Sequence, residues 1–215
     1  MNQLLWTMLI AAGAALIYGF PIRAWFFRWG AAPDDLERVM PGDACVDRPT
    51  YATTLAIRIQ ARPEHVWPWL VQMGHKRGGL YSYDWLDRMF GYLDRPSATR
   101  ILPEWQNLKV GDRIPLGRGA AFPVCFLAPN QSLVMADNNG GFGWSWEFGL
   151  YQTGRTETTL VSRNRARVPT SWRWAFGMRL LEPAAFLMTR RMLLGLQRRA
   201  EALAADTGVR VTRAA

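Results

Sequence analysis

Apolar and polar residues alternate along several short segments in the middle of the chain. In the stretch 53–61, Leu55, Ile57 and Ile59 share one face of an extended chain, and polar side chains occupy most of the other face. A period of two predicts a half-buried strand. The turns that follow are short and rich in Gly, Asn and Pro, which favours antiparallel hairpins. Further strands are expected at 112–116, 121–128, 131–137, 143–152 and 156–168.

Apolar residues at helical spacing occur between the first two of these strands and again after the last one. Pro63 and Glu64 suit the first turn of a helix that ends near Gly74, because proline needs no N–H there and a carboxylate favours the positive end of the helix dipole. A second short helix is expected from about Ser82 to Phe90. Residues 179–205 predict a long helix, with Pro183 near its true start. Its apolar face consists of Leu181, Ala185, Met188, Met192 and Leu196.

The first 22 residues contain no charged side chain. Within them, Leu4–Ile22 is an apolar run of 19 residues, and a helix of that length covers about 28 Å, close to the hydrocarbon thickness of a bilayer. Arg23 and Arg28 follow the run and nothing basic precedes it. This arrangement favours a retained membrane anchor over a cleaved signal peptide or a buried helix, and it places the following domain in the cytoplasm.

These patterns divide the chain into four parts. We expect a transmembrane anchor at 1–27, a linker at 28–52, a folded domain at 53–206 and a tail at 207–215. The linker assignment rests on Pro33, Pro41, Gly42 and Pro49, which interrupt any sustained period. The prediction is therefore a single-pass membrane protein with one α+β domain.

The net charge of +9 is concentrated near the carboxyl terminus, where residues 155–215 carry 12 arginines and 4 acidic residues. No known nucleic-acid-binding pattern accompanies this charge, so we expect no nucleic-acid partner. Arg163, Arg165 and Arg167 alternate along one predicted strand, which indicates a face that is wet or that meets an anion. Cys45 and Cys125 are too few for a disulfide framework and are expected to be inert apolar thiols.

Little in the sequence points to catalysis. The chain has two histidines with no neighbouring acids at metal spacing, and we expect neither a metal site nor a cofactor. His75, in the loop 75–79, is expected to be solvated. A polar-aromatic cluster of Tyr81, Tyr83, Asp84 and Trp85 is the strongest candidate for polarising a carbonyl, although a capped helix start explains it as well. Glu104 is a weaker candidate of the same kind.

Large apolar side chains are more numerous than a small core needs, with 11 Trp and 10 Phe. Trp144, Trp146 and Phe148 alternate along one strand, so their rings share a face. If that face is concave, the rings line a cavity together with Met188 and Met192 from the long helix. Core packing explains them equally well.

The order of these elements and several stretches of sequence within them resemble the START-like (SRPBCC) superfamily, and within it the polyketide cyclase/dehydrase and lipid-transport group. The resembling stretches are ARPEHVWPWLVQMG at 61–74, GGLYSYDWLDRMFG at 78–91, ILPEWQNLKVGDRI at 101–114 and LLEPAAFLMTRRMLLGLQRRAE at 180–201. The resemblance implies a helix-grip fold, in which a curved antiparallel sheet of seven strands wraps a long C-terminal helix. Six strands are recognisable in the sequence. The superfamily contains carriers, sensors and enzymes, so the resemblance does not fix a reaction.

Three functions remain open at this point. The first is a membrane-anchored protein that binds a hydrophobic small molecule or lipid in an internal cavity, without catalysis. The second is a cyclase or dehydratase acting on a polyketide-like or aromatic substrate. The third is a membrane-tethered interaction module. A closed apolar pocket favours the first, a pocket into which Asp84, Glu104 or His75 points favours the second, and a filled core favours the third.

Overall fold

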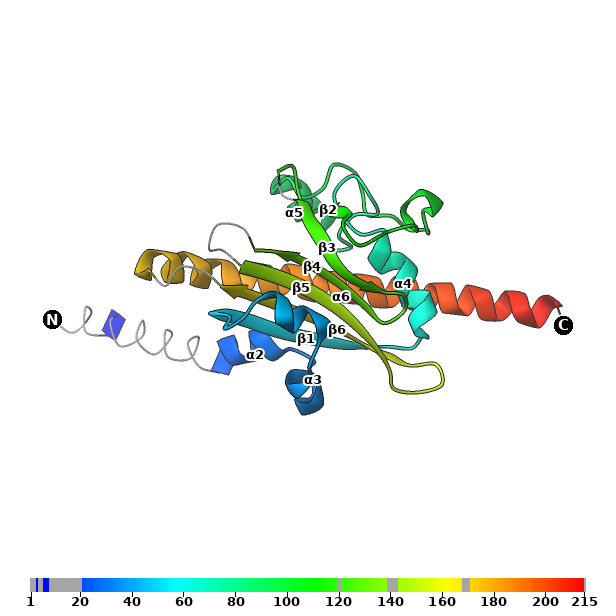
Figure 1. The fold of residues 1–215 in the computed structure, drawn as a ribbon, viewed down its shortest axis with the longest axis horizontal. Helices are drawn as coiled ribbons and strands as arrows, with labels where there is room; N and C mark the ends of the chain where they lie inside the picture. The colour runs from blue at the N-terminus through cyan, green and yellow to red at the C-terminus, as the bar shows by residue number, and fades with distance from the viewer. Residues whose placement is uncertain are drawn as a thin grey trace.

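Six antiparallel strands form one curved sheet that lies across a single long helix (Figure 1). The computed structural model describes residues 3, 6, 7, 21–119, 121–138, 143–167 and 171–214. The strand order is β1-β6-β5-β4-β3-β2, so the first strand pairs with the last and every other strand pairs with its neighbour in sequence. The strands are β1 (Tyr51–Ile59), β2 (Arg113–Pro115), β3 (Ala121–Ala128), β4 (Ser132–Asp137), β5 (Gly143–Gln152) and β6 (Thr158–Arg167).

The long C-terminal helix packs on the concave side of this sheet, together with the helix that follows β1. The long helix is α6, which runs from Trp172 to Ala214 and extends past the sheet at both ends (Figure 1). It begins well before Pro183, which lies inside it, and it continues beyond residue 205, so both predicted ends were too narrow. The other helical segments are α2 (Arg23–Arg28), α3 (Pro33–Glu37), η2 (Pro41–Cys45), α4 (Pro63–Val71), α5 (Asp84–Met89) and η3 (Pro103–Trp105).

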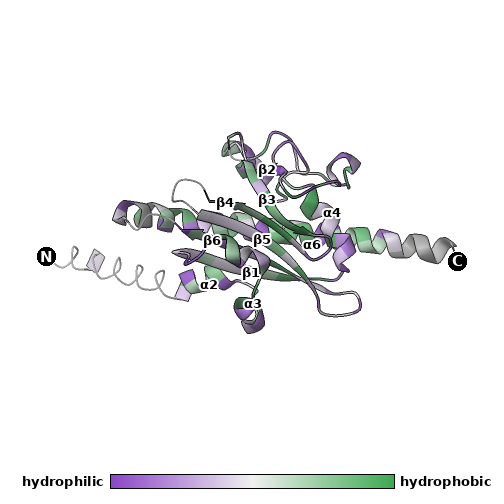
Figure 2. Ribbon diagram, viewed as in Figure 1, coloured by the Kyte–Doolittle hydropathy of each residue, from purple (hydrophilic) through white to green (hydrophobic). Residues whose placement is uncertain are grey.

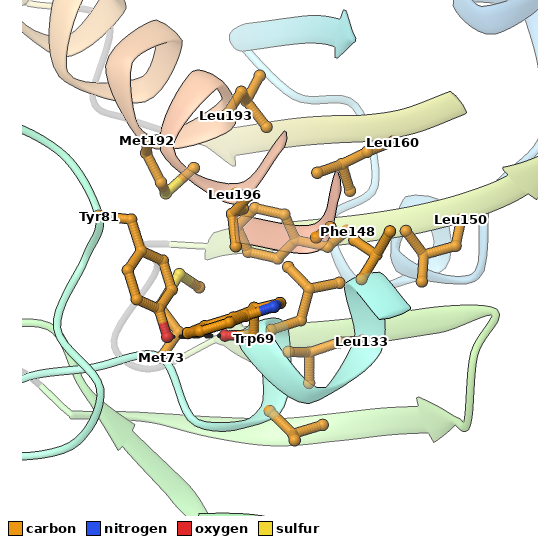
Figure 3. Packing of buried hydrophobic residues seen from close by; sticks show 14 of the residues in the cluster. Trp69, Met73, Tyr81, Leu133, Phe148, Leu150, Leu160, Met192, Leu193 and Leu196 are labelled. Atoms are coloured by element: carbon orange, nitrogen blue, oxygen red, sulfur yellow. Dashed lines mark hydrogen bonds between the residues drawn. The ribbon is translucent and has the colours of Figure 1, made fainter. Parts of the chain in front are cut away.

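The main core lies where α4 and α6 meet the middle of the sheet (Figure 3). Leu193 and Leu196 of α6 are fully buried and face Phe148 of β5 and Leu160 of β6. Leu181 belongs to the predicted apolar stripe of the helix, yet it is 62% exposed. The stripe therefore contributes to the core only from Met192 onward, where the helix passes over the sheet. Together these features fit the helix-grip fold, with six strands among the described residues.

The segment predicted as a linker packs against the convex face of the sheet. Met40 and Val46 are buried there, and Gly42 donates its backbone N–H to Glu147 Oε2 at 2.7 Å. The Ala56 N–H bonds to the Trp29 carbonyl at 3.0 Å, which brings the chain close to β1. The prolines thus belong to a linker that lies across the domain surface. We call its residues 33–46 the strap, and it contains two short helices.

This strap also changes the interpretation of the arginines on β6. Arg163 is 6% exposed and meets Asp43 Oδ2 at 2.8 Å. Arg165 reaches the other oxygen of Asp43 at 3.1 Å, and only Arg167 is exposed. Of the two alternatives for this face, wet or in contact with an anion, the second holds for Arg163, and the anion is Asp43 of the same chain.

Most of the predicted membrane anchor at 1–27 lies outside the described residues, and of the apolar run Leu4–Ile22 the structure describes only residues 6, 7, 21 and 22. Among the residues that are described, no helix has both the length and the apolarity that a bilayer span requires.

Candidate functional site

Two adjoining cavities lie between α6 and the concave face of the sheet. Their volumes are about 420 Å³ and about 390 Å³. Tyr92 and Ala185 line both cavities and are exposed, so both open toward the surface there. The residues common to the two linings are Tyr92, Trp144, Trp146, Ala185 and Thr189.

Two tryptophans of β5 form the floor that the cavities share. Trp144 and Trp146 point to the concave side because they alternate with Ser145 and Glu147, which face the strap on the convex side. Their ring centroids are 6.0 Å apart, and the Trp146 indole donates to Ser162 Oγ at 2.9 Å. The hydrogen bond satisfies the polar atom of the indole, so its apolar face is free to contact a ligand.

All three rings of β5 lie on the concave side, and two of them, Trp144 and Trp146, line the cavities. Phe148 points to the same side and packs 5.0 Å from Trp146, measured between ring centroids. It is fully buried in the core and lines neither cavity.

The larger cavity has mostly apolar walls. Phe122 of β3 stands against Trp144, with ring centroids 4.3 Å apart. Met188 and Met192 contribute from α6, as predicted from the helical period, and methionine adapts its shape to irregular ligands. The remaining lining residues are Leu80, Ser82, Asp87, Tyr92, Leu116, Ala185 and Thr189.

Asp87 is the carboxyl group of this larger cavity, and the sequence did not single it out. Its side chain is 0% exposed, and neither carboxyl oxygen has a hydrogen-bond partner among the described residues. Burial, reinforced by the nearby charge of Asp84, raises the pKa of Asp87 to about 7. The group is thus poised between its neutral and ionised forms near neutral pH.

The smaller cavity lies between α2, β1 and the first half of α6. Phe26 of α2 stacks on Phe186 of α6 with ring centroids 4.4 Å apart. At the edge of the same contact, Arg23 binds both carboxylate oxygens of Glu182, at 2.9 and 3.0 Å. The segment that follows the apolar run therefore forms one wall of the cavity.

The structure brings the predicted polar-aromatic cluster together, but at a separate depression away from the two cavities. Tyr81 is 1% exposed and donates its hydroxyl to the Trp69 carbonyl at 3.1 Å (Figure 3). Asp84 accepts hydrogen bonds from the Ser97 N–H and hydroxyl, at 3.0 and 2.7 Å. Both contacts serve to fix the loop, so neither residue faces the two cavities described above.

Tyr83 and Trp85 lie with Tyr81 and Asp84 around a separate, basic depression of about 470 Å³. Trp85 is 67% exposed, and the Arg191 guanidinium lies 5.3 Å from the centre of the Tyr83 ring. The arginines of this depression are Arg88, Arg191, Arg198 and Arg199.

The two remaining candidates do not reach the cavities. Glu104 is exposed in η3. His75 is 5% exposed, so the expectation of a solvated loop was wrong. The His75 Nδ1 lies 3.2 Å from the Tyr92 carbonyl oxygen. The backbone N–H of His75 donates to the Pro115 carbonyl at 2.7 Å. Within the described part of the chain, no group of three His, Cys, Asp or Glu side chains gathers as metal ligands would.

Comparison with known proteins gives only distant similarities. No family model matches the chain, and no curated protein matches it. Among solved structures, the protein MLL2253 from Mesorhizobium loti is similar at 16% identity over 69% of this chain and 98% of its own, with a TM-score of 0.40. The conserved protein EF2215 from Enterococcus faecalis, at 13% identity, covers 78% of this chain and 88% of its own, with a TM-score of 0.43.

A third structure, CalU16 from Micromonospora echinospora, has 19% identity over 72% of this chain and 86% of its own, with a TM-score of 0.35. Similarity of this degree establishes neither a family nor an activity.

Proposed function

We propose that this protein binds an apolar small molecule or lipid in the cavities beneath α6, and that it does so beside a membrane to which its amino-terminal segment attaches it. The observation that carries the proposal is the pair of adjoining cavities floored by Trp144 and Trp146. Stacked aromatic walls with few polar groups are typical of sites for apolar ligands. As part of this proposal we place the chain in the START-like group, whose helix-grip architecture it fits.

The cavities argue against the two alternatives in different ways. An interaction module needs no interior space, and a filled core was its expected sign. A cavity into which Asp84, Glu104 or His75 points would favour the cyclase or dehydratase alternative, and none of these three residues lines either cavity. What remains in favour of an enzyme is Asp87, because a buried carboxyl with a pKa near neutrality is suited to proton transfer.

The membrane part of the proposal rests on an exposed apolar stripe of α6 as well as on the amino-terminal sequence. Trp172, Phe176, Leu180 and Leu187 are each at least 50% exposed, and at about 100° per residue they fall on one side of the helix. They belong to the first half of α6, which carries both hydrophobic and hydrophilic residues in Figure 2. An exposed apolar stripe of this kind favours the bilayer interface.

This stripe lies next to the point where the apolar run joins the domain. Trp25 and Phe26 of α2 both pack on Phe186 of α6, with ring centroids 5.1 and 4.4 Å apart. Since Leu4–Ile22 ends directly before α2, an anchored chain would hold the stripe against the membrane surface. The smaller cavity, which α2 helps to form, would then open close to the bilayer.

The ligand-binding part is tested by filling the cavities from α6. Thr189 lines both of them, so Thr189→Trp should occupy much of the space. Calorimetric titration with isopropylnaphthalene should show binding to the wild type with a negative heat-capacity change, and binding to Thr189→Trp should be at least tenfold weaker. Ala202→Trp, on an exposed position of the same helix, is the matched control. Equal binding to the wild type and to Thr189→Trp would refute the ligand-binding part of the proposal.

A further inference from the structure

The larger cavity contains two polar groups that the fold itself leaves unsatisfied. Both carboxyl oxygens of Asp87 and the hydroxyl oxygen of Ser82 are buried, and none of the three atoms has a hydrogen-bond partner among the described residues. Both residues line the larger cavity. They come from α5 and from the turn that leads into it, so they belong to one side of the cavity.

The fold does not account for the position of Asp87. A carboxylate near the start of a helix usually accepts from the free N–H groups of the first turn. Asp84 occupies that place in α5 and instead accepts two hydrogen bonds from Ser97. Asp87 lies one turn later, and its own N–H already donates to the Tyr83 carbonyl at 2.8 Å. Its side chain therefore neither caps the helix nor joins an ion pair in the described residues.

An unpaired buried carboxyl is costly for folding, because the group loses its hydrogen bonds to water and gains none in exchange. Such a group is retained where a ligand supplies the missing partner. Among the described residues, no Arg, Lys or His lines the larger cavity, and its other hydroxyl groups are those of Tyr92 and Thr189. The apolar rings around it disfavour the charged form, and a neutral carboxyl both donates and accepts a hydrogen bond.

We propose that Asp87 and Ser82 form the polar end of the binding cavity and hydrogen-bond a carbonyl or hydroxyl group of an uncharged, otherwise apolar ligand. This inference rests on the proposed function and specifies the class of ligand. The apolar part of the molecule lies on Phe122, Trp144 and Trp146, and its single polar group points toward the start of α5. A hydrocarbon would leave both groups unpaired, and a quaternary or primary amine would require an ionised Asp87.

The same reasoning extends to stability. If the carboxyl serves only the ligand, then Asp87→Leu, which replaces it with an apolar side chain of similar size, should leave the melting temperature unchanged or raise it. If Asp87 instead supports the fold, the melting temperature should fall. This measurement separates a binding role from a structural one.

The test uses three probes of nearly equal shape: acetylnaphthalene, isopropylnaphthalene and naphthylethylamine. The affinity of each for the full-length wild type, Asp87→Leu and Ser82→Ala is measured by calorimetric titration. We expect Asp87→Leu to lower the ratio of acetylnaphthalene to isopropylnaphthalene affinity about tenfold, the usual effect of one buried hydrogen bond, while isopropylnaphthalene binds equally well or more tightly. Ser82→Ala should lower the ratio by a smaller factor. Asp94→Leu, at an exposed position in the next loop, is the control and should leave the ratio unchanged.

Each other outcome has one meaning. An unchanged ratio in Asp87→Leu, with isopropylnaphthalene still bound, overturns this inference and leaves the proposed function standing. Preferential binding of naphthylethylamine overturns it too, because Asp87 would then act as a counter-ion. If none of the three probes binds to the wild type, the proposed function itself fails.

Discussion

Asp43 and Arg163 form a nearly buried ion pair across the convex face of the sheet, with Oδ2 and Nη1 2.8 Å apart and side-chain exposures of 18% and 7%. The same guanidinium donates to the carbonyls of Arg38 and Asp35, both at 2.7 Å. One side chain of β6 thus contacts the strap at Asp35, Arg38 and Asp43. Since Glu147 on the neighbouring strand accepts from Gly42, the strap and the floor of the cavities are parts of one structure.

Removing the acid from this pair should be strongly destabilising. Asp43→Ala leaves Arg163 buried without its counter-ion, and we expect the free energy of unfolding to fall by about 3–5 kcal/mol, as for other broken buried pairs. Asp47→Ala is the control, because Asp47 and its partner Arg48 are both more than 80% exposed and such pairs contribute little. Urea denaturation of the two variants measures the difference. Equal stability would show that the Asp43–Arg163 pair does not stabilise the fold.

The strap also shows where prediction from sequence ends. Alternation predicted all six strands to within about two residues at most ends, because period two depends only on local geometry. The burial of Arg163 depends on a segment more than 100 residues away, and nothing in the alternation of Arg163, Arg165 and Arg167 reveals that contact. His75 was misjudged for the same reason, since Tyr92 and Pro115 cover its loop.

The candidate site was predictable only in its apolar half. Trp144, Trp146, Met188 and Met192 follow from strand and helix periods, and the structure brings all four to the larger cavity. The burial of Asp87 in the cavity could not be predicted from the sequence, because a second acid three residues after Asp84 is typical of the solvated side of a helix. Only the folding of α5 over the cavity turns Asp87 inward.

The close contact between Gly195 of α6 and the Tyr81 backbone could not be predicted from the sequence either. A Cβ at position 195 would collide with the Tyr81 carbonyl oxygen.

Cys45 and Cys125 were predicted to be inert, and the structure places their sulfur atoms 3.5 Å apart, joining η2 to β3. A mild diazene oxidant should remove one hydrogen from each thiol and form a disulfide within one molecule. The bridge joins residues 80 positions apart and should stabilise the fold by about 2–4 kcal/mol. Peptide mass spectrometry without reductant identifies the linked peptides, and urea denaturation gives the stability.

The control for this prediction is Cys45→Ser, which retains the shape of the side chain and cannot form the bridge. Its stability should not respond to the oxidant. Two titratable thiols remaining in the wild type after oxidation would show that the strap does not bring the sulfur atoms together in solution.

Membrane attachment should depend on the amino-terminal run first and on the α6 stripe second. Removing residues 1–22 should release most of the protein from anionic vesicles in a flotation assay, because the apolar run is lost. In the truncated protein, Leu180→Asp with Leu187→Asp should abolish the remaining binding, since both side chains are at least 50% exposed on the stripe. The control is Val39→Asp, an 89% exposed apolar residue of the strap. Full vesicle binding of the truncated double variant would contradict the membrane role of both segments.

Asp87 should leave a signature in the pH dependence of stability. Its pKa rises from an ordinary 3.8 to about 7 in the folded protein, chiefly because burial disfavours the charged form. The folded state therefore holds this proton more tightly than the unfolded state does. The contribution of this proton to folding stability is complete below the unfolded pKa of Asp87 and is lost as the pH rises through the folded pKa.

The variant Asp87→Leu lacks this carboxyl group. Between about pH 4 and about pH 7, the free energy of unfolding of the wild type should therefore fall by about 1.4 kcal/mol per pH unit relative to that of the variant. Urea denaturation of both proteins at each pH gives this difference directly, and other titrating groups cancel. A difference that stays constant over this range would mean that Asp87 is ionised in the folded protein, with a partner that the cavity does not show.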